Sequence, residues 1–197
     1  MTDRFIVFEG PDGAGTTFQA KAFAERLERE GTPVLLTAEP SQGPIGLWIR
    51  RILNGEEKLP PSALQLLFCA DRAWHVENVI QPALQEGKTV VSDRYAPSTL
   101  IYGEALGMDF AWLAGINRFF PKPAVTVFTL PPFEVCQERL ARRNDHDLFE
   151  KSEFQKKIYD GYLSYAAADK SVHCVDTSGA KEEVAETIFQ LIQHPSL

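Results

Sequence analysis

A short apolar run that ends in a glycine-rich turn near the start of the chain constrains the fold most. Residues 5–9 read Phe-Ile-Val-Phe-Glu, and Gly10, Gly15 and Thr17 follow at the spacing Gly, four residues, Gly, Lys, Ser or Thr. Thr16 occupies the position of the lysine in that pattern. A strand, a glycine turn and a helix in this order converge backbone N–H groups on one point, which is typical of phosphate binding. We therefore expect a phosphate-binding loop without its usual side-chain cation.

Apolar runs alternate with helical patterns along the rest of the chain. Continuous apolar runs predict buried strands at residues 5–9, 34–37, 89–92, 124–129 and 173–176. Helices are predicted at residues 16–30, 43–53, 61–86 (with a kink or new start at Pro82), 98–106, 110–119, 133–142, 151–168 and 181–193, with a polar break over 143–150. This alternation favours an α/β fold, in which a five-stranded parallel sheet carries helices on both faces.

Length, charge and cysteine spacing restrict the class of protein. A chain of 197 residues without repeats or linkers predicts a single domain over residues 1–197. The net charge of -7 argues against a nucleic-acid partner, although clustered arginines can still make a local anion site. Three widely spaced cysteines favour free thiols in a reducing compartment. The sequence shows no run of membrane-spanning length, so we expect a cytoplasmic protein without a membrane partner.

Polar residues follow three of the predicted strands at the end where ligands bind in such sheets. Asp12 comes after the first strand, Glu39 after the second, and Asp93 with Arg94 after the third. From the residues alone, other interpretations stay open: Asp12 as a turn aspartate, Glu39 as a cap, and Asp93 with Arg94 as a salt bridge. Their common place at the carboxyl edge favours a functional site.

Five segments in this order resemble thymidylate kinases of the nucleoside monophosphate kinase family. They are residues 8–19 (Phe-Glu-Gly-Pro-Asp-Gly-Ala-Gly-Thr-Thr-Phe-Gln), 37–40 (Thr-Ala-Glu-Pro), 67–75 (Leu-Phe-Cys-Ala-Asp-Arg-Ala-Trp-His), 93–102 (Asp-Arg-Tyr-Ala-Pro-Ser-Thr-Leu-Ile-Tyr) and 147–150 (Asp-Leu-Phe-Glu). The resemblance covers residues 4 to 190. It implies a three-layer P-loop kinase fold with a short lid at about 139–150, and a homodimer. It further implies phosphoryl transfer from ATP to dTMP, which gives dTDP and ADP, with Mg²⁺ as cofactor.

The resemblance also assigns roles to the donor and metal positions. The ATP-binding residues would be Gly10, Pro11, Asp12, Gly13, Ala14, Gly15, Thr16 and Thr17. Thr17 and Asp93 would hold Mg²⁺. Asp12 would contact the substrate sugar or a Mg²⁺-bound water, and Glu39 would position Arg94 or the metal shell.

On the acceptor side, the resemblance implies a thymidylate site. Phe68 would stack on thymine, Arg72 would bond the base edge, and Arg94 would grip the phosphate. The remaining substrate-binding residues would be Glu39, Arg50, Ser98, Thr99 and Tyr102. Spacing alone leaves Phe68 and Arg72 open to another interpretation, a core phenylalanine beside a solvated arginine.

Catalysis would depend on mobile positive charge, because the loop has no lysine. We expect the catalytic set to be Asp12, Arg94, Arg139, Arg142 and Arg143, with one or more of the last three closing over the ATP phosphates. Solvated helix arginines are the alternative for these three. Thr16, Ala38 and Leu148 each lack the positive charge of the family pattern. Two other functions therefore stay open: a nucleotide-binding protein with little catalysis, or a kinase for another deoxynucleoside monophosphate.

Overall fold

A computed structural model of the protein, which describes residues 4–142 and 148–193, has one parallel sheet at its centre. Its five strands lie in the order β2-β3-β1-β4-β5. They are β1 (Phe5–Glu9), β2 (Val34–Ala38), β3 (Thr89–Asp93), β4 (Val125–Thr129) and β5 (Val172–Val175). All of β1 is buried, as its continuous apolar sequence predicts.

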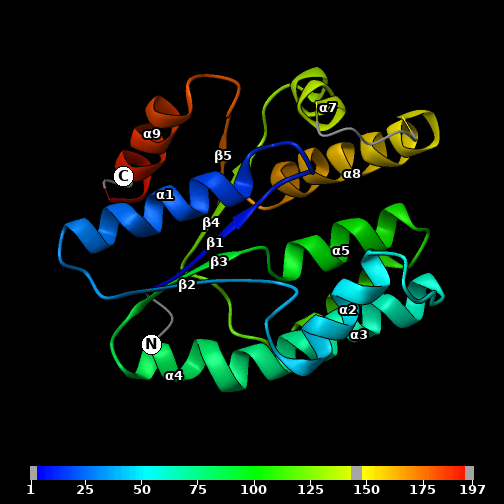
Figure 1. Ribbon diagram of the computed structural model, residues 1–197, viewed down its shortest axis with the longest axis horizontal. Coiled ribbons are helices and arrows are strands. Elements are labelled where there is room, and N and C mark those ends of the chain that lie inside the picture. Colours follow the sequence, from blue (N-terminus) through cyan, green and yellow to red (C-terminus); the bar gives the residue numbers. More distant parts are fainter. Residues whose placement is uncertain (1–3, 143–147, 194–197) are drawn as a thin grey trace.

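Helices cover both faces of the sheet (Figure 1). They are α1 (Thr16–Arg29), α2 (Pro44–Leu53), α3 (Pro61–His75), the π-helix η2 (Val76–Ile80), α4 (Gln81–Gln85), α5 (Ala96–Ala105), α6 (Phe110–Asn117), α7 (Phe133–Ala141), α8 (Leu148–Ala168) and α9 (Lys181–Gln193). The predicted α/β fold, a five-stranded parallel sheet with helices on both faces, is confirmed. No helix within residues 4–142 and 148–193 combines the length and apolar character needed to cross a membrane.

Alternate side chains of β1 supply two separate cores. Ile6 and Phe8 face α1 and α9, where the ring of Phe23 lies 5.6 Å from Phe8. Phe5 and Val7 face the opposite layer, which includes η2 and α4. Burial of each such side chain contributes about 1.5–3 kcal/mol to folding. The central strand is therefore fixed from both sides, and the loop that follows it starts from a rigid position.

The structure confirms one predicted feature and corrects two boundaries. The helical segment predicted over residues 61–86 has the new start expected at Pro82, because η2 widens the turn just before α4, which carries Pro82 in its first turn. Proline has no N–H for an i−4 bond and its ring crowds that carbonyl, so the helix has to restart. The polar break predicted over 143–150 is too long, since α8 begins at Leu148. The last strand is Val172–Val175, one residue earlier than predicted.

The carboxyl ends of β1, β2 and β3 meet at one edge of the sheet. The backbone N–H of Arg94 donates to Phe8 at 2.8 Å, and that of Glu39 donates to Asp93 at 3.0 Å. These bonds extend the sheet pairing beyond the last strand residues. The polar residues that follow the three strands are thus brought together, as expected for a ligand site in a parallel sheet.

Candidate active site

The phosphate loop, residues 10–17, joins β1 to α1 in a conformation that requires glycine. Gly13 and Gly15 have φ angles of 84° and 87°, in the left-handed region. A Cβ atom on Gly13 would also lie 2.5 Å from the carbonyl oxygen of Cys136 on α7. Gly15 caps α1 and contributes no side chain, so the first N–H groups of the helix are left for an anionic ligand.

Thr16, at the lysine position, turns inward. Its side chain is buried, and its Oγ1 lies 2.8 Å from Oγ1 of Thr129 at the end of β4. We expected Thr16 among the ATP-binding residues, but the structure places its hydroxyl on the sheet. Of its polar groups, the backbone N–H is the one left for a phosphate.

Thr17 and Asp93 form a candidate magnesium site. The hydroxyl of Thr17 donates to Oδ2 of Asp93 at 2.6 Å across the gap between α1 and β3. Oδ1 of Asp93 is buried and has no hydrogen-bond partner among the described residues. A hydroxyl and a carboxylate beside a phosphate loop are the ligands that Mg²⁺ uses with nucleotide phosphates. The donor set therefore fits Mg²⁺.

Arg94 lies at the centre of the polar cluster. Its φ of 73° is unusual for a residue with a side chain, and directs the guanidinium toward the loop. Nη2 donates to Oδ1 of Asp12 at 2.7 Å, while Nη1 lies 3.2 Å from Ser98 and 3.4 Å from Tyr102. The structure thus brings together Asp12 from segment 8–19 with Arg94, Ser98 and Tyr102 from segment 93–102.

Glu9, the last residue of β1, organises this cluster, and sequence reasoning missed it. The carboxylate is fully buried and accepts bonds from Ser98 Oγ at 2.6 Å, Tyr162 OH at 2.9 Å and the backbone N–H of Tyr95 at 2.7 Å. Burial raises the pKa of Glu9, and the nearby Arg94 opposes that rise. A carboxylate that ends an otherwise apolar strand was the signal in the sequence.

Arg72 and Glu39 form a second, fully buried cluster. Arg72 donates to Oε2 of Glu39 at 2.6 and 3.0 Å, and to Thr99 at 3.0 Å. It also donates to the side chain of Asn117, and His75 Nδ1 lies 3.2 Å from the other oxygen of Glu39. Glu39 was expected to position Arg94 or the metal shell, and it contacts Arg72 instead. The reason is geometric, since α3 delivers Arg72 and His75 directly onto the end of β2.

Phe68 and Arg50 flank this cluster. Phe68 is half-buried one turn before Arg72 on the same face of α3, so its ring is partly accessible. Arg50 on α2 donates to the carbonyl oxygen of Pro40, and its Nε is buried without a partner among the described residues. Arg50 therefore lies beside the turn that carries Glu39.

The arginines before the lid are placed differently from one another. Arg139 donates to the carbonyl oxygens of Gly13, Ala14 and Thr177 at 3.3, 3.4 and 2.7 Å. It braces the back of the phosphate loop and does not extend over it. Arg142 is exposed at the end of α7. Arg143, and most of the lid predicted over 139–150, lie outside the described residues.

Gln155 on α8 was also missed. Its Nε2 donates to Oδ2 of Asp12 at 3.2 Å, which ties the helix after the lid to the phosphate loop. No motif separates this glutamine from the polar residues around it, so its position in space was needed to find it.

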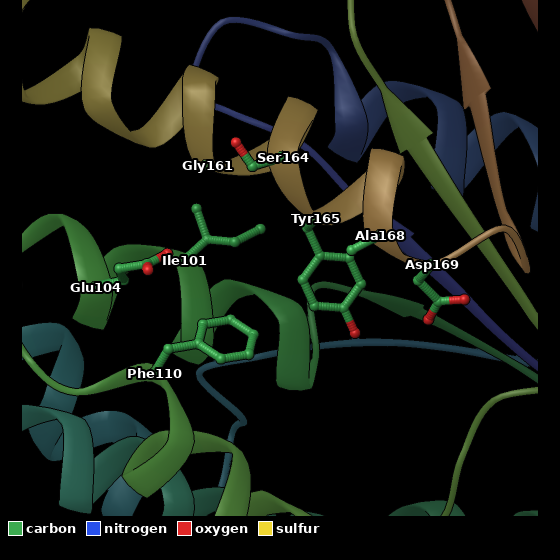
Figure 2. A pocket seen from close by; sticks show the side chains of 8 residues that line it. All are labelled: Ile101, Glu104, Phe110, Gly161, Ser164, Tyr165, Ala168 and Asp169. Atoms are coloured by element: carbon green, nitrogen blue, oxygen red, sulfur yellow. The ribbon is translucent and has the colours of Figure 1, made fainter.

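A groove between α5 and α8 is lined by residues that do not belong to these clusters, and Figure 2 shows those lining residues. Its volume is about 510 Å³, and Ile101, Glu104, Phe110 and Tyr165 are among its lining residues. Thr99 and Tyr102 belong to the clusters described above and do not line the groove. The site that the motifs predict is thus the polar edge of the sheet.

Comparison with known proteins identifies the family. The thymidylate kinase family matches residues 8–188. The chain is 39% identical over 203 residues to a probable thymidylate kinase of Pyrococcus horikoshii, covering 100% of this chain and 99% of the relative. It is 40% identical to the Pyrococcus abyssi protein of the same description, with the same coverage. It is 41% identical to the thymidylate kinase of Pelotomaculum thermopropionicum, over 93% of this chain and 90% of the relative. The chain therefore belongs to the thymidylate kinase family.

Proposed function

We propose that this protein transfers a phosphoryl group from ATP to dTMP, giving dTDP and ADP. The observation that carries the proposal is the position of Arg94, whose guanidinium lies 2.7 Å from Asp12 of the phosphate loop. A guanidinium beside the loop can hold one phosphate next to another, which in-line transfer requires. The names of the relatives, thymidylate kinase and probable thymidylate kinase, support the same reaction.

Arg72 and its neighbours supply the base site in this proposal. A guanidinium has five N–H donors, and Glu39, Thr99 and Asn117 take four of those of Arg72. One Nη1–H is left for a carbonyl oxygen of thymine, while Phe68 offers the face of its ring. Because the other four donors of Arg72 are paired, that single donor has a fixed direction.

Tyr102 and Asp12 supply the sugar site. The Tyr102 hydroxyl donates to Oδ1 of Asp12 at 3.2 Å, and its ring lies 5.4 Å from the Arg94 guanidinium. Burial raises the pKa of Tyr102, so the hydroxyl stays protonated at neutral pH. The ring would crowd a 2′-hydroxyl, which favours deoxyribose.

The donor site is the phosphate loop with Mg²⁺. Thr17 and Asp93 would hold the ion, which neutralises charge on the donor phosphates when bound. Arg139 keeps the loop in place through its bonds to three carbonyl oxygens. We propose that Arg142 and Arg143, at a lid over about residues 139–150, supply the charge that Thr16 cannot.

Replacement of both arginines tests the lid. In the double variant Arg142→Ala and Arg143→Ala, kcat would fall about 10²-fold. In a separate variant, Thr16→Lys would raise kcat only modestly above that of the wild type. Unchanged turnover in the double variant would contradict the assignment.

We also propose a cytoplasmic homodimer built on one domain. Helices α2 and α3 pack together and expose Leu47, Leu53 and Leu66, with exposed fractions of 50%, 57% and 48%. Large apolar residues gathered on adjacent helices are a common basis for association. This supports the dimer that the family resemblance implies.

An assay of ADP release with a series of nucleoside monophosphates tests the function. We expect turnover with dTMP and ATP in the presence of Mg²⁺. The kcat/KM for dTMP should be at least about tenfold above that for ribothymidine 5′-monophosphate, which differs from dTMP by its 2′-hydroxyl. Binding of nucleotide without turnover on any acceptor would favour the binding-protein alternative. Faster turnover on another deoxynucleotide would correct the acceptor.

A further inference from the structure

Thr16 and Thr129 form a hydroxyl pair directly beneath the phosphate loop. Their Oγ1 atoms are 2.8 Å apart, and Oγ1 of Thr129 lies 3.0 Å from the carbonyl oxygen of Glu9. Each hydroxyl has one proton to donate. Because Thr129 donates its proton to the Glu9 carbonyl, Thr16 has to be the donor within the pair. The chain of bonds therefore runs from the loop into the sheet.

Gly10 closes the space around the pair. The exposed fractions of Thr16 and Thr129 are 5% and 0%. A Cβ atom on Gly10 would lie 2.3 Å from Oγ1 of Thr129 and 2.8 Å from Oγ1 of Thr16. The backbone at the start of the loop thus rests directly on both hydroxyls, while Thr16 is at the loop's end. One pair fastens both ends of the loop to β4.

We propose that the pair is a latch that holds the phosphate loop for the donor nucleotide, and that Thr129 is a positioning residue for that site. The latch turns Thr16 away from the ligand, while the adjacent Thr17 faces Asp93 at 2.6 Å. A lysine at this position reaches outward to the phosphates, whereas Thr16 donates inward. Thr16 therefore makes a hydrogen bond within the protein, where a lysine would place a positive charge beside the phosphates.

This inference rests on the proposed function, because it takes the loop's ligand to be the donor nucleotide. Its test is therefore a binding measurement, in which MgADP and dTMP are titrated separately by calorimetry. The variants are Thr129→Val, Thr129→Ser, Thr16→Val and the double valine variant. Valine keeps the shape of threonine without the hydroxyl, and serine keeps the hydroxyl. Thr89→Val is the control, since Thr89 is a buried threonine at the start of β3.

Thr129→Val removes the bond to Glu9 and the bond from Thr16, so it should weaken MgADP binding about fivefold or more, the effect of losing at least one neutral hydrogen bond, and leave dTMP binding unchanged. Thr129→Ser should restore the affinity. The double variant should match Thr129→Val, because Thr129→Val already removes the one bond that Thr16→Val removes. Thr89→Val should bind both ligands like the wild type.

Wild-type affinity for MgADP in Thr129→Val, or an equal loss for both ligands, would overturn the latch. If Thr129→Val does not fold, Thr16→Val carries the same test, since it keeps the bond from Thr129 to Glu9. A wild-type protein that binds MgADP without phosphorylating dTMP would refute the proposed function, and the affinities of the variants would still decide the latch. A wild-type protein that does not bind MgADP would overturn both.

Discussion

Arg94 illustrates how one side chain can connect three segments of the chain. Its guanidinium touches Asp12 from the loop, Ser98 and Tyr102 from α5, and lies 3.5 Å from Tyr162 on α8. A planar group with five directed donors can serve all of these oxygens at once, and the compact ammonium of lysine cannot. The left-handed backbone at this position is the cost of aiming that group at these oxygens.

Arg94→Lys should therefore lower kcat/KM for dTMP by about 10²-fold or more, because a point charge cannot bridge phosphate and Asp12. The KM for ATP should change by less than about threefold, since the donor loop makes its own contacts. Steady-state kinetics with each substrate varied in turn measures both effects. Arg118→Lys, an exposed arginine after α6, is the control and should match the wild type. A loss confined to ATP would contradict the assignment of Arg94 to the acceptor.

Glu9 gives a prediction about pH. Burial raises its pKa in the folded state above that of the unfolded chain, so the folded protein binds more protons between the two values. The free energy of unfolding therefore falls as pH rises through that interval. Glu9→Gln removes this contribution, and its stability difference from the wild type should shrink as pH rises from about 4 to 8. Urea unfolding at several pH values measures the difference.

Glu104→Gln is the matched control for this measurement, because Glu104 is exposed on α5. Its stability difference from the wild type should stay constant over the same pH range. A difference for Glu9→Gln that grows with pH would show that the buried carboxylate is stabilised by its neighbours in the ionised form.

At the scale of elements, the sequence predicted the sheet better than the site. Each apolar run became a strand, because a strand buried on both faces needs continuous hydrophobicity and little else. Asp12, Asp93 and Arg94 were predicted as site residues because they lie at or just after the ends of strands. Glu9 and Gln155 were missed, since their roles depend on which helices approach them. The partner of Glu39 was wrong for the same reason, as the crossing of α3 over β2 is a tertiary feature.

The contact between α5 and α8 gives a prediction at this scale. A Cβ atom on Gly161 would lie 2.8 Å from Cγ2 of Ile101, a β-branched side chain that is 1% exposed and cannot turn aside. Gly161→Ala should separate the two helices, lower the free energy of unfolding by about 1–3 kcal/mol and raise the KM for dTMP. Thr99 and Tyr102 lie on the same helix as Ile101, so their positions shift with it. Thermal unfolding and kinetics measure the two effects.

Gly115→Ala is the control, because a Cβ atom there meets open space. Gly115 lies within α6, where alanine should be neutral or stabilise the protein by up to about 1 kcal/mol. If Gly161→Ala behaved in the same way, the two helices would have more freedom to move than their contact indicates.

In the whole molecule, the two faces and the carboxyl edge of the sheet carry different parts of the proposed site. The layer of α1 and α9 lies beside the phosphate loop, and the opposite layer brings α3, α5 and α8 to the clusters around Arg72 and Arg94 (Figure 1). In the proposed function, the phosphoryl group would pass between the two at this edge of the sheet. The exposed leucines on α2 and α3 lie outside this arrangement, and the proposed dimer would cover them.

Replacement of Leu66 tests that association. If α2 and α3 pair between two copies, a buried carboxylate would oppose the contact, and Leu66→Glu should shift the protein from dimer to monomer at micromolar concentration. Leu163→Glu is the matched control, since Leu163 on α8 is 46% exposed, against 48% for Leu66. Sedimentation equilibrium of the wild type and both variants measures the mass directly. A wild-type monomer, or equal masses for the two variants, would contradict a dimer built on these helices. Because α3 also carries Phe68 and Arg72, loss of the dimer should raise the KM for dTMP more than the KM for ATP.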